Sequence, residues 1–222
     1  MSTPLLVSIQ VGLPRSYGTV GADDPMDRPW TTGFFKQTVD GPRWLARTNL
    51  ADDGQADLVN HGGEDKAVLC YAAAHYPEWR DALHQPELPH GAFGENFTID
   101  GQTEDAVCVG DTYRLGDAIV QVSQPRQPCW KLAWRWRIKE LTAFVERTGR
   151  TGWYVRVLQE GEVQAGQAVT LLDRPYPAWT VARATRVMRQ RANDPEAAGA
   201  LAGVELLAAS WRDRLAEAAA GR

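Results

Sequence analysis

Short runs of apolar residues fill the first two thirds of the chain and predict strands rather than long helices. The run at residues 5–11 predicts the first strand, and the continuous apolar run at 67–72 is typical of a buried strand. Further runs lie within 95–124 and 152–174, where Gly and Asp turn signals separate them. Many short strands at close spacing favour a barrel or a sandwich.

Two helices are expected to interrupt this β pattern. The first is expected over residues 73–83, with Pro77 in its first turn, where a proline is tolerated. The second is expected over residues 130–147, and Gly149 follows it as a residue suited to a helix end. The chain therefore predicts a mixed, β-rich α+β fold.

Helical spacing replaces the β pattern towards the C-terminal end and predicts three short helices. The first and the third each carry one apolar stripe: Val181, Ala184 and Met188 in the first, and Leu207, Trp211 and Leu215 in the third. Asp194 and Pro195 supply a cap and a first helical position for the middle helix, and Gly203 ends it. We therefore predict a β-rich domain over 1–175 and a three-helix domain over 176–222.

Composition and charge narrow the classes of function. The 222 residues carry a formal net charge of -4, which argues against a surface for nucleic acid polymers. The N-terminal stretch has no basic segment followed by a long apolar one, and no run of about 18 apolar residues occurs, so we expect no signal peptide and no membrane span. The three cysteines form neither a disulfide framework nor a zinc pattern, which favours a reducing compartment, the cytoplasm.

Cys129 is the residue with the clearest potential for chemistry. It lies in the segment QPRQPCWKL, where prolines stiffen the chain and Arg126 and Lys131 are near in sequence. Cations and the start of a helix favour the thiolate, which acts as a nucleophile or as a ligand for soft metals. The alternative is that Cys129 is a small buried hydrophobe, as free cysteines often are. Cys70 and Cys108 lie inside apolar runs and are expected in the core.

The segment NHGGEDKAV predicts an anion site. The adjacent Gly62 and Gly63 can present successive backbone N–H groups to an anion. Lys66 can add a full charge, and His61 can hydrogen-bond a ligand or act as an acid. The alternative is an ordinary loop before the next strand, with Lys66 solvated.

The segment GAFGEN is the second candidate for a ligand site. Gly91 and Gly94 allow a ligand to approach the backbone closely. Glu95 and Asn96 then place an acceptor and an amide beside it, although an ordinary turn explains the same residues. Lys36, in TTGFFKQ, either meets a phosphate or extends its charged end to solvent. The nine tryptophans are dispersed along the chain and do not predict an aromatic cage.

Four segments in this order resemble the MOSC domain, which is named for the C-terminal part of molybdenum-cofactor sulfurases. They are VNHGGEDKAV, GAFGENFTIDG, VCVGDTYRLGDAIVQVSQPRQPCWKL and TGRTGWYVRVLQEGEV. The resemblance is closest to a stand-alone bacterial subgroup linked to resistance to hydroxylaminopurine. In that subgroup a three-helix domain follows the barrel, and the stretch from WTVARATRVM to SWRDRLAE is similar to it.

The resemblance implies a β-barrel core with flanking helices and a site for the molybdenum cofactor, a pterin that carries the metal. In relatives a cysteine thiolate completes the coordination of the metal, and the matching position is Cys129. The implied cofactor-binding residues are Lys36, Gly62, Gly63, Lys66, Gly91, Gly94 and Arg126, and the implied catalytic residues are Cys129, His61, Glu95 and Asn96. The implied reaction reduces the N–OH group of a small N-hydroxylated substrate, such as a hydroxylaminopurine base, to N–H.

The sequence leaves the redox partner and two rival functions open. No flavin, haem or iron–sulfur motif is visible, so electrons are expected from a separate protein, a flavoprotein reductase. In one rival, Cys129 carries a persulfide and delivers sulfur. In the other, the chain binds the cofactor or a base without catalysis, and its three C-terminal helices dock a partner or form a homodimer.

Overall fold

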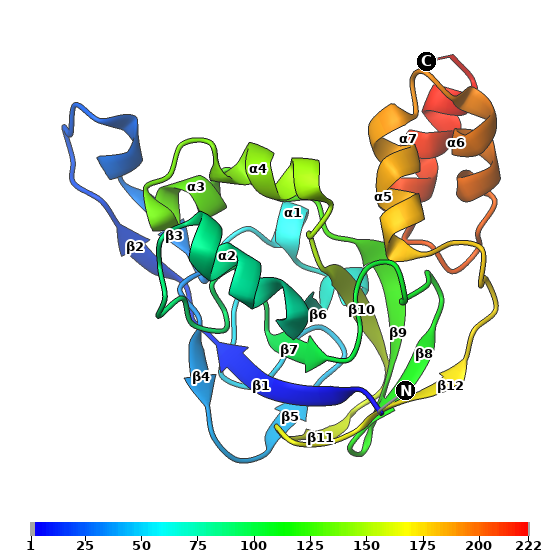
Figure 1. Ribbon diagram of the computed structural model, residues 1–222, viewed down its shortest axis with the longest axis horizontal. Coiled ribbons are helices and arrows are strands. Elements are labelled where there is room, and N and C mark those ends of the chain that lie inside the picture. The colour runs from blue at the N-terminus through cyan, green and yellow to red at the C-terminus, as the bar shows by residue number, and fades with distance from the viewer. Residues whose placement is uncertain (1–2, 222) are drawn as a thin grey trace.

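The computed structural model describes residues 3–221 and shows a large curved sheet, short helices beside it and a group of three helices at the C-terminal end (Figure 1). The strands are β1 (Leu5–Val11), β2 (Arg15–Tyr17), β3 (Trp30–Thr32), β4 (Gln37–Val39), β5 (Arg43–Leu45), β6 (Val68–Ala72), β7 (Phe97–Asp100), β8 (Thr112–Leu115), β9 (Ala118–Pro125), β10 (Trp153–Gln159), β11 (Gly161–Val163) and β12 (Val169–Asp173). The α-helices are α1 (Leu58–His61), α2 (Tyr76–Ala82), α3 (Lys131–Trp136), α4 (Leu141–Thr148), α5 (Val181–Gln190), α6 (Pro195–Ala202) and α7 (Ala209–Ala219).

Eight of the strands form one sheet, in the order β12-β8-β9-β10-β6-β7-β1-β4. Only β6 and β7 run parallel, and the other neighbours in this sheet are antiparallel. Leu5 of β1 bridges Ala168, and the Val169 N–H donates to the Pro4 carbonyl at 2.8 Å, so the β12 end of the sheet curves back to β1. The predicted β-rich core with flanking helices is confirmed, but one bridge and three backbone hydrogen bonds at this edge do not pair β1 with β12 along their length. Within the described residues the core is therefore not the closed barrel that we expected.

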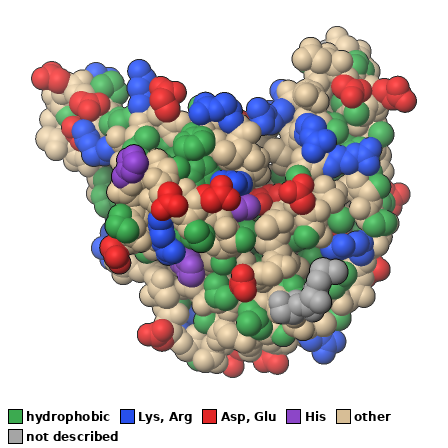
Figure 2. All heavy atoms as spheres, in the orientation of Figure 1, with side chains coloured by type: hydrophobic (Ala, Val, Ile, Leu, Met, Phe, Trp, Pro, Cys, Tyr) green, Lys and Arg blue, Asp and Glu red, His purple; other side chains and the backbone are tan. Residues whose placement is uncertain are grey.

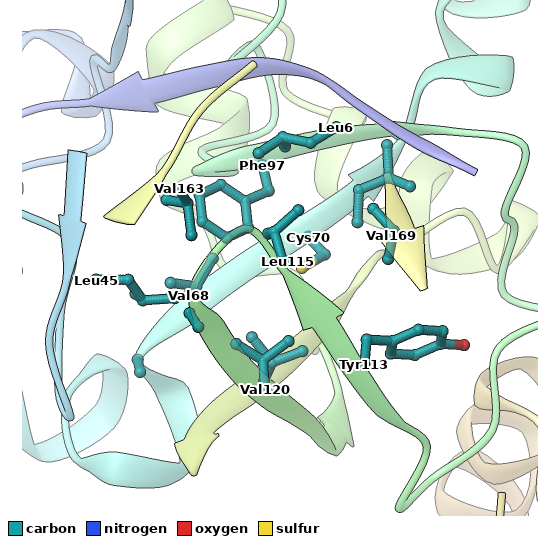
Figure 3. Packing of buried hydrophobic residues seen from close by; sticks show 14 of the residues in the cluster. Leu6, Leu45, Val68, Cys70, Phe97, Tyr113, Leu115, Val120, Val163 and Val169 are labelled. Atoms are coloured by element: carbon teal, nitrogen blue, oxygen red, sulfur yellow. The ribbon is translucent and has the colours of Figure 1, made fainter. Parts of the chain in front are cut away.

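The main core fills the inside of this curve. Val68, Phe97 and Val120 point into it from strands that are distant in the sequence (Figure 3). Cys70 lies among them, 2% exposed, and burial raises the pKa of its thiol. Cys108 is also buried. The prediction that these two cysteines are core residues is confirmed.

A second core lies under helices α2, α3 and α4. Tyr71 of β6 stacks on Phe93 with the ring centroids 4.6 Å apart, and Trp79 of α2 packs against the same Phe93 at 5.3 Å. The Trp79 indole N–H also donates to the Tyr71 hydroxyl at 2.7 Å. Phe93 belongs to the GAFGEN segment, so this packing holds that loop against the sheet.

The three C-terminal helices have a core of their own and also contact the sheet. Met188, Leu201 and Trp211 are buried in it, together with Val109 from the β-rich part. The Ala208 N–H donates to the Ser123 carbonyl of β9 at 2.9 Å. The three-helix prediction is confirmed, and the division at residues 175 and 176 stays a prediction.

The caps of the C-terminal helices are those expected from the sequence. The Asp194 carboxylate accepts from the Ala197 N–H at 3.0 Å, Pro195 is the first residue of α6, and Gly203 is its C-cap. The single helix expected over 130–147 is wrong, because Arg137 takes a left-handed conformation with φ 54° and separates α3 from α4. Arg137 forms ion pairs with Asp24 and Asp27, contacts that the local sequence does not show.

The N-terminal 45 residues contain more strands than expected. Strands β2 and β3 form a hairpin that projects at the upper left of Figure 1, and β5 pairs with β11 in a separate two-stranded sheet. On the face seen in Figure 2, acidic and basic side chains are interspersed. No helix within residues 3–221 is both long and apolar enough to cross a membrane.

Candidate active site

Cys129 lies in a fixed loop between the end of β9 and the start of α3. The Arg126 N–H donates to the Gly152 carbonyl at 3.1 Å, which anchors the start of the loop to the strand beside it. The Cys129 carbonyl accepts from the Thr142 hydroxyl at 3.1 Å and from the Leu132 N–H at 3.2 Å. Unlike the two core cysteines, Cys129 is partly exposed, and its side chain lines two neighbouring cavities.

The first cavity, the inner pocket, has a volume of about 80 Å³, and Cys129 is one of its lining residues. Segments from the whole β-rich part line it, and its charged or titratable lining residues are Lys36, Asp53, His61, Lys66, Arg126, Cys129, Lys131 and Tyr154. Four of these side chains are cations and one is a carboxylate. The surplus of positive charge favours an anionic ligand.

Arg126 is the most distinctive of these cations. It is 3% exposed, and its Nη2 donates to the Phe93 carbonyl at 3.0 Å. Its Nη1 is buried and has no hydrogen-bond partner. A buried donor without a partner is costly, and more so when it carries charge. The inner pocket is therefore lined by a buried cation with one unpaired donor nitrogen.

Lys36 is paired inside the protein instead of free for a ligand. Its Nζ forms a buried ion pair with Asp53, which also accepts from the Gly12 N–H at 2.8 Å and from the Asn96 side-chain amide at 2.9 Å. Burial lowers the pKa of Lys36, while Asp53 opposes that shift. The sequence suggested a phosphate or solvent as the partner of the Lys36 ammonium. In the structure the partner is the Asp53 carboxylate.

His61 and Lys66 both reach the inner pocket. Burial, followed by the positive charge of Lys131, lowers the pKa of His61. The His61 Nδ1 lies 3.5 Å from the Asp57 carboxylate, too poorly aligned for a hydrogen bond. The Asn60 N–H helps to lower the pKa of Asp57 to about 2, so that carboxylate is ionised near neutral pH. Lys66 donates to the Asn60 carbonyl at 2.7 Å, and burial lowers its pKa.

Gly94 and Asn96 also line the inner pocket, but their contacts are with other residues of the protein and hold the pocket wall in place. Gly94 has φ 83°, and a Cβ on it would lie 2.4 Å from the Phe34 ring. The Asn96 side chain accepts from the Leu69 N–H at 3.2 Å and donates to Asp53 and to the Gln10 carbonyl. Its hydrogen bonds are therefore used within the protein.

Glu95 and three of the glycines are not brought to either cavity. Glu95 is fully buried, and its carboxylate accepts from the Gly91 N–H at 2.6 Å, from the Phe93 N–H at 3.1 Å and from the Tyr76 hydroxyl. The Gly91 N–H is thereby occupied. Gly62 and Gly63 are also absent from the lining of both cavities. Glu95 and these backbone groups thus lie away from both cavities, and their assignment to the ligand site stays a prediction.

Several lining residues were not predicted from the sequence. Asp53, Gln127 and Tyr154 reach the inner pocket from a loop, from the cysteine segment and from β10. Tyr154 could have been named from the sequence, because it belongs to the TGRTGWYVRVLQEGEV segment on which the resemblance rests. Lys131 was named for its charge and does face the cavity with Cys129. Asp53 could not have been named from the sequence, because its role depends on its ion pair with the distant Lys36.

The second cavity, the outer chamber, has a volume of about 690 Å³. It shares His61, Lys66, Gln127, Cys129, Lys131 and Tyr154 with the inner pocket. Its other walls include Trp30 and Trp130 on one part and Ser210, Trp211 and Arg214 of α7 on another. Arg214 donates to the Gln127 side chain at 2.9 Å, so the three-helix domain contacts the cysteine loop directly.

Family models match most of the chain. The MOSC domain matches residues 57–170, and a YiiM-like, 3-alpha helix domain matches residues 179–217. The chain belongs to the MOSC family. The MOSC match covers just over half of the 222 residues and includes Cys129, and the second match covers the three C-terminal helices.

Curated relatives agree with this family. YflK of Bacillus subtilis is 48% identical over 181 residues, which are 82% of this chain and 81% of YflK. YiiM of Escherichia coli is 40% identical over 145 residues, 64% of this chain and 65% of YiiM. A protein of Gibberella moniliformis named reductase is 41% identical over 164 residues, 72% of this chain. The match spans only 29% of that fungal protein.

Solved structures show the same fold over nearly the full chain. YiiM from Geobacillus stearothermophilus superposes with a TM-score of 0.81 at 34% identity, over 97% of this chain and 99% of that one. YiiM from Escherichia coli superposes with a TM-score of 0.75 at 29% identity, over 96% of this chain and 94% of that one.

The residues of the inner pocket fit an anionic group that carries a metal. Arg126 offers a buried cationic donor without an acceptor, and the Cys129 thiol is a soft donor at the same cavity. Within residues 3–221 no three His, Cys, Asp or Glu side chains group together so that they could hold a metal ion. A metal at Cys129 would therefore have to bring its other ligands with it.

Proposed function

We propose that this protein is a molybdenum-cofactor-dependent reductase of N-hydroxylated compounds, with Cys129 as the protein ligand of the metal. The observation that carries the proposal is the position of Cys129 between the cation-rich inner pocket and the outer chamber. A MOSC family member that places its one partly exposed thiol there has a soft metal ligand next to an anion site.

The four cations of the inner pocket would have different roles in binding the cofactor. Arg126 would donate to the anionic part of the pterin from its unpaired Nη1, and Lys66 and Lys131 would add charge at the same cavity. Lys36 would act through Asp53, which fixes the Asn96 amide, so its part is to hold the pocket in shape. When bound, the cofactor would supply the two-electron redox chemistry, and the protein would orient the substrate and deliver protons.

Protons are the second requirement of the proposed reaction. Reduction of N–OH to N–H and water consumes two electrons and two protons, so a proton path must reach the substrate. His61 faces both cavities, and its lowered pKa keeps it neutral near pH 7, a form that can take up a proton and pass it on. Tyr154 also faces both cavities, and burial raises its pKa, so its hydroxyl stays protonated.

The electrons would come from a separate flavoprotein reductase. The name of the fungal relative is consistent with an oxidoreductase, although the match covers 29% of that protein. Purified protein that reduced the substrate with NADPH alone would contradict the need for a separate donor.

The direct test is the molybdenum and pterin content of three proteins: wild type, Cys129→Ala and Cys108→Ala. Cys108→Ala is a matched control because it removes a buried thiol that lines neither cavity. The proteins are expressed in a host that makes the cofactor and are purified without oxygen. We expect about one molybdenum per chain in wild type and in the control, and loss of molybdenum in Cys129→Ala.

Two outcomes would overturn the proposal. The first is the absence of molybdenum and pterin from wild type even after reconstitution with the cofactor. The second is a labile gain of one sulfur atom on Cys129 in a protein without metal, which mass spectrometry would detect and which would favour sulfur transfer.

A further inference from the structure

We propose that Trp130, supported by Trp30, is the surface on which a planar heterocyclic substrate stacks in the outer chamber. The inference rests on the proposed function and adds to it the residue that binds the ring of the substrate. Both tryptophans line the outer chamber, which also contains Cys129.

Trp130 and Trp30 come from distant parts of the chain and meet in one aromatic cluster. Their ring centroids lie 5.3 Å apart, and Trp134 is 4.4 Å from Trp130 and 5.8 Å from Trp30. Tyr17 and Phe35 complete the cluster behind Trp30, at 6.0 and 5.9 Å. Three of the nine tryptophans thus meet in one cluster, to which Trp30 comes from a distant part of the chain.

Trp130 remains exposed in spite of these neighbours. Of its surface, 46% is accessible, and it is the residue that directly follows Cys129. A large aromatic ring at a cavity wall, fixed by other rings, offers a flat face at little cost in side-chain entropy. The Lys131 ammonium lies 6.0 Å from the centre of the Trp130 ring, so this wall also carries positive charge.

The rest of the chamber fits the polar edge of a heterocycle. Gln124, Gln127 and Ser210 line it and offer both donors and acceptors. The chamber thus combines the aromatic faces of Trp30 and Trp130 with a lining that is otherwise mostly polar or charged. A planar ring with nitrogen and oxygen atoms at its edge matches both features, whereas a small aliphatic compound would use neither the flat face nor most of the volume of about 690 Å³.

The position relative to Cys129 connects this surface to the reaction. Cys129 and Trp130 both line the outer chamber, so a ring stacked on Trp130 lies in a cavity that Cys129 also lines. Trp130 would bind and orient the ring and would take no part in proton or electron transfer.

The test compares four variants of the full-length protein: Trp130→Ala, Trp130→Leu, Trp130→Phe and Trp44→Ala. Trp44 on β5 is the matched control, because it is 50% exposed and lines neither cavity. The first readout is the Kd of 6-hydroxylaminopurine, measured by equilibrium dialysis with the protein free of cofactor. The second is the KM and kcat of the loaded protein for 6-hydroxylaminopurine and for N-hydroxyurea, which has no ring.

We expect the Ala and Leu variants to raise the Kd and the KM for the heterocycle about tenfold, since both remove the ring face. The Phe variant should stay within about threefold of wild type, because it keeps a smaller ring. Trp44→Ala should change nothing, and kinetics with N-hydroxyurea should be the same in all four variants. Trp130→Leu is the control for collapse of the loop in Trp130→Ala, because leucine keeps a large apolar side chain beside Cys129.

Unchanged binding of the heterocycle in both Trp130→Ala and Trp130→Leu would overturn the inference. An equal loss for the heterocycle and for N-hydroxyurea, at normal molybdenum content, would also overturn it, because such a loss marks damage to the site as a whole. A protein that binds the heterocycle through Trp130 but holds no molybdenum would contradict the proposed function and leave the stacking surface standing.

Discussion

The buried guanidinium of Arg126 donates to the Phe93 carbonyl at 3.0 Å from one terminal nitrogen and leaves the other without a partner. This contact joins the cysteine segment to the GAFGEN segment. Since Arg126 lines the inner pocket and this nitrogen has no acceptor, an anion within its reach would gain a charge-assisted hydrogen bond from a group that is already desolvated.

Replacement of Arg126 by Gln should therefore reduce cofactor retention more than stability. We expect pterin retained after prolonged dialysis to fall about tenfold in Arg126→Gln, which is the loss of one charge-assisted hydrogen bond of about 1.5 kcal/mol. Arg126→Lys keeps the charge and should retain more. Pterin fluorescence per chain measures the effect, and equal retention in all three proteins would contradict it.

The Lys36–Asp53 ion pair in the wall of the inner pocket is expected to stabilise the folded protein. Asp53→Asn leaves the buried Lys36 without its carboxylate and should lower the free energy of unfolding by about 3 kcal/mol. Lys36→Met in the same chain removes the stranded charge, so the double variant should be more stable than Asp53→Asn alone. Urea unfolding measures both, and a double variant that showed the sum of the two single losses would argue against the pair.

Gly94 is expected to be irreplaceable for two reasons at once. Its φ of 83° is unfavourable for any side chain, and a Cβ would meet the Phe34 ring at 2.4 Å. Gly94→Ala should cost about 3 kcal/mol of unfolding free energy. Gly149 at the end of α4 has a similar φ of 73° but open space around it, so Gly149→Ala should cost only about 1 kcal/mol. Thermal unfolding of the two variants separates steric overlap from backbone strain.

Local sequence patterns predicted the elements whose periodicity is strong. The strand at 5–11, the buried strand before residue 73 and the caps at Asp194 and Pro195 are present. The short strands β2 to β5 were missed, because three-residue strands carry too little periodicity to be recognised. The break at Arg137 was missed because the local sequence does not mark it, and the ion-pair partners of Arg137, Asp24 and Asp27, are distant in the sequence.

The candidate site shows the same division between local and distant causes. Cys129, Arg126 and Lys66 were found because their chemical types stand out in a short segment, and all three line the inner pocket. Glu95 also stands out, but it binds its own loop, and only the fold shows which way a carboxylate points. The pairing of Trp130 with Trp30 was missed because it joins residues that are 100 positions apart.

The pKa of His61 should depend on Lys131. Burial and the positive charge of Lys131 lower the pKa of His61, so Lys131→Met should raise it towards its usual value. Because the folded pKa lies below the unfolded one, the unfolded state binds more protons between the two, and this contribution to stability is lost as pH falls below about 6.5. The loss should be smaller in Lys131→Met. NMR titration of His61 measures the shift, and an unchanged pKa would contradict the coupling.

Cys129 should be the first of the three cysteines to be alkylated. It is partly exposed at two cavities, whereas Cys70 is 2% exposed and Cys108 1%, and burial raises the pKa of both core thiols. With a small excess of iodoacetamide on the folded protein, we expect Cys129 to carry nearly all of the label, as measured on the tryptic peptides by mass spectrometry. Reconstitution with the cofactor should then slow the labelling of Cys129 and leave Cys70 and Cys108 unaffected. Protection of all three cysteines alike would indicate a general tightening of the fold, whereas selective protection of Cys129 follows only if its sulfur is covered by the ligand.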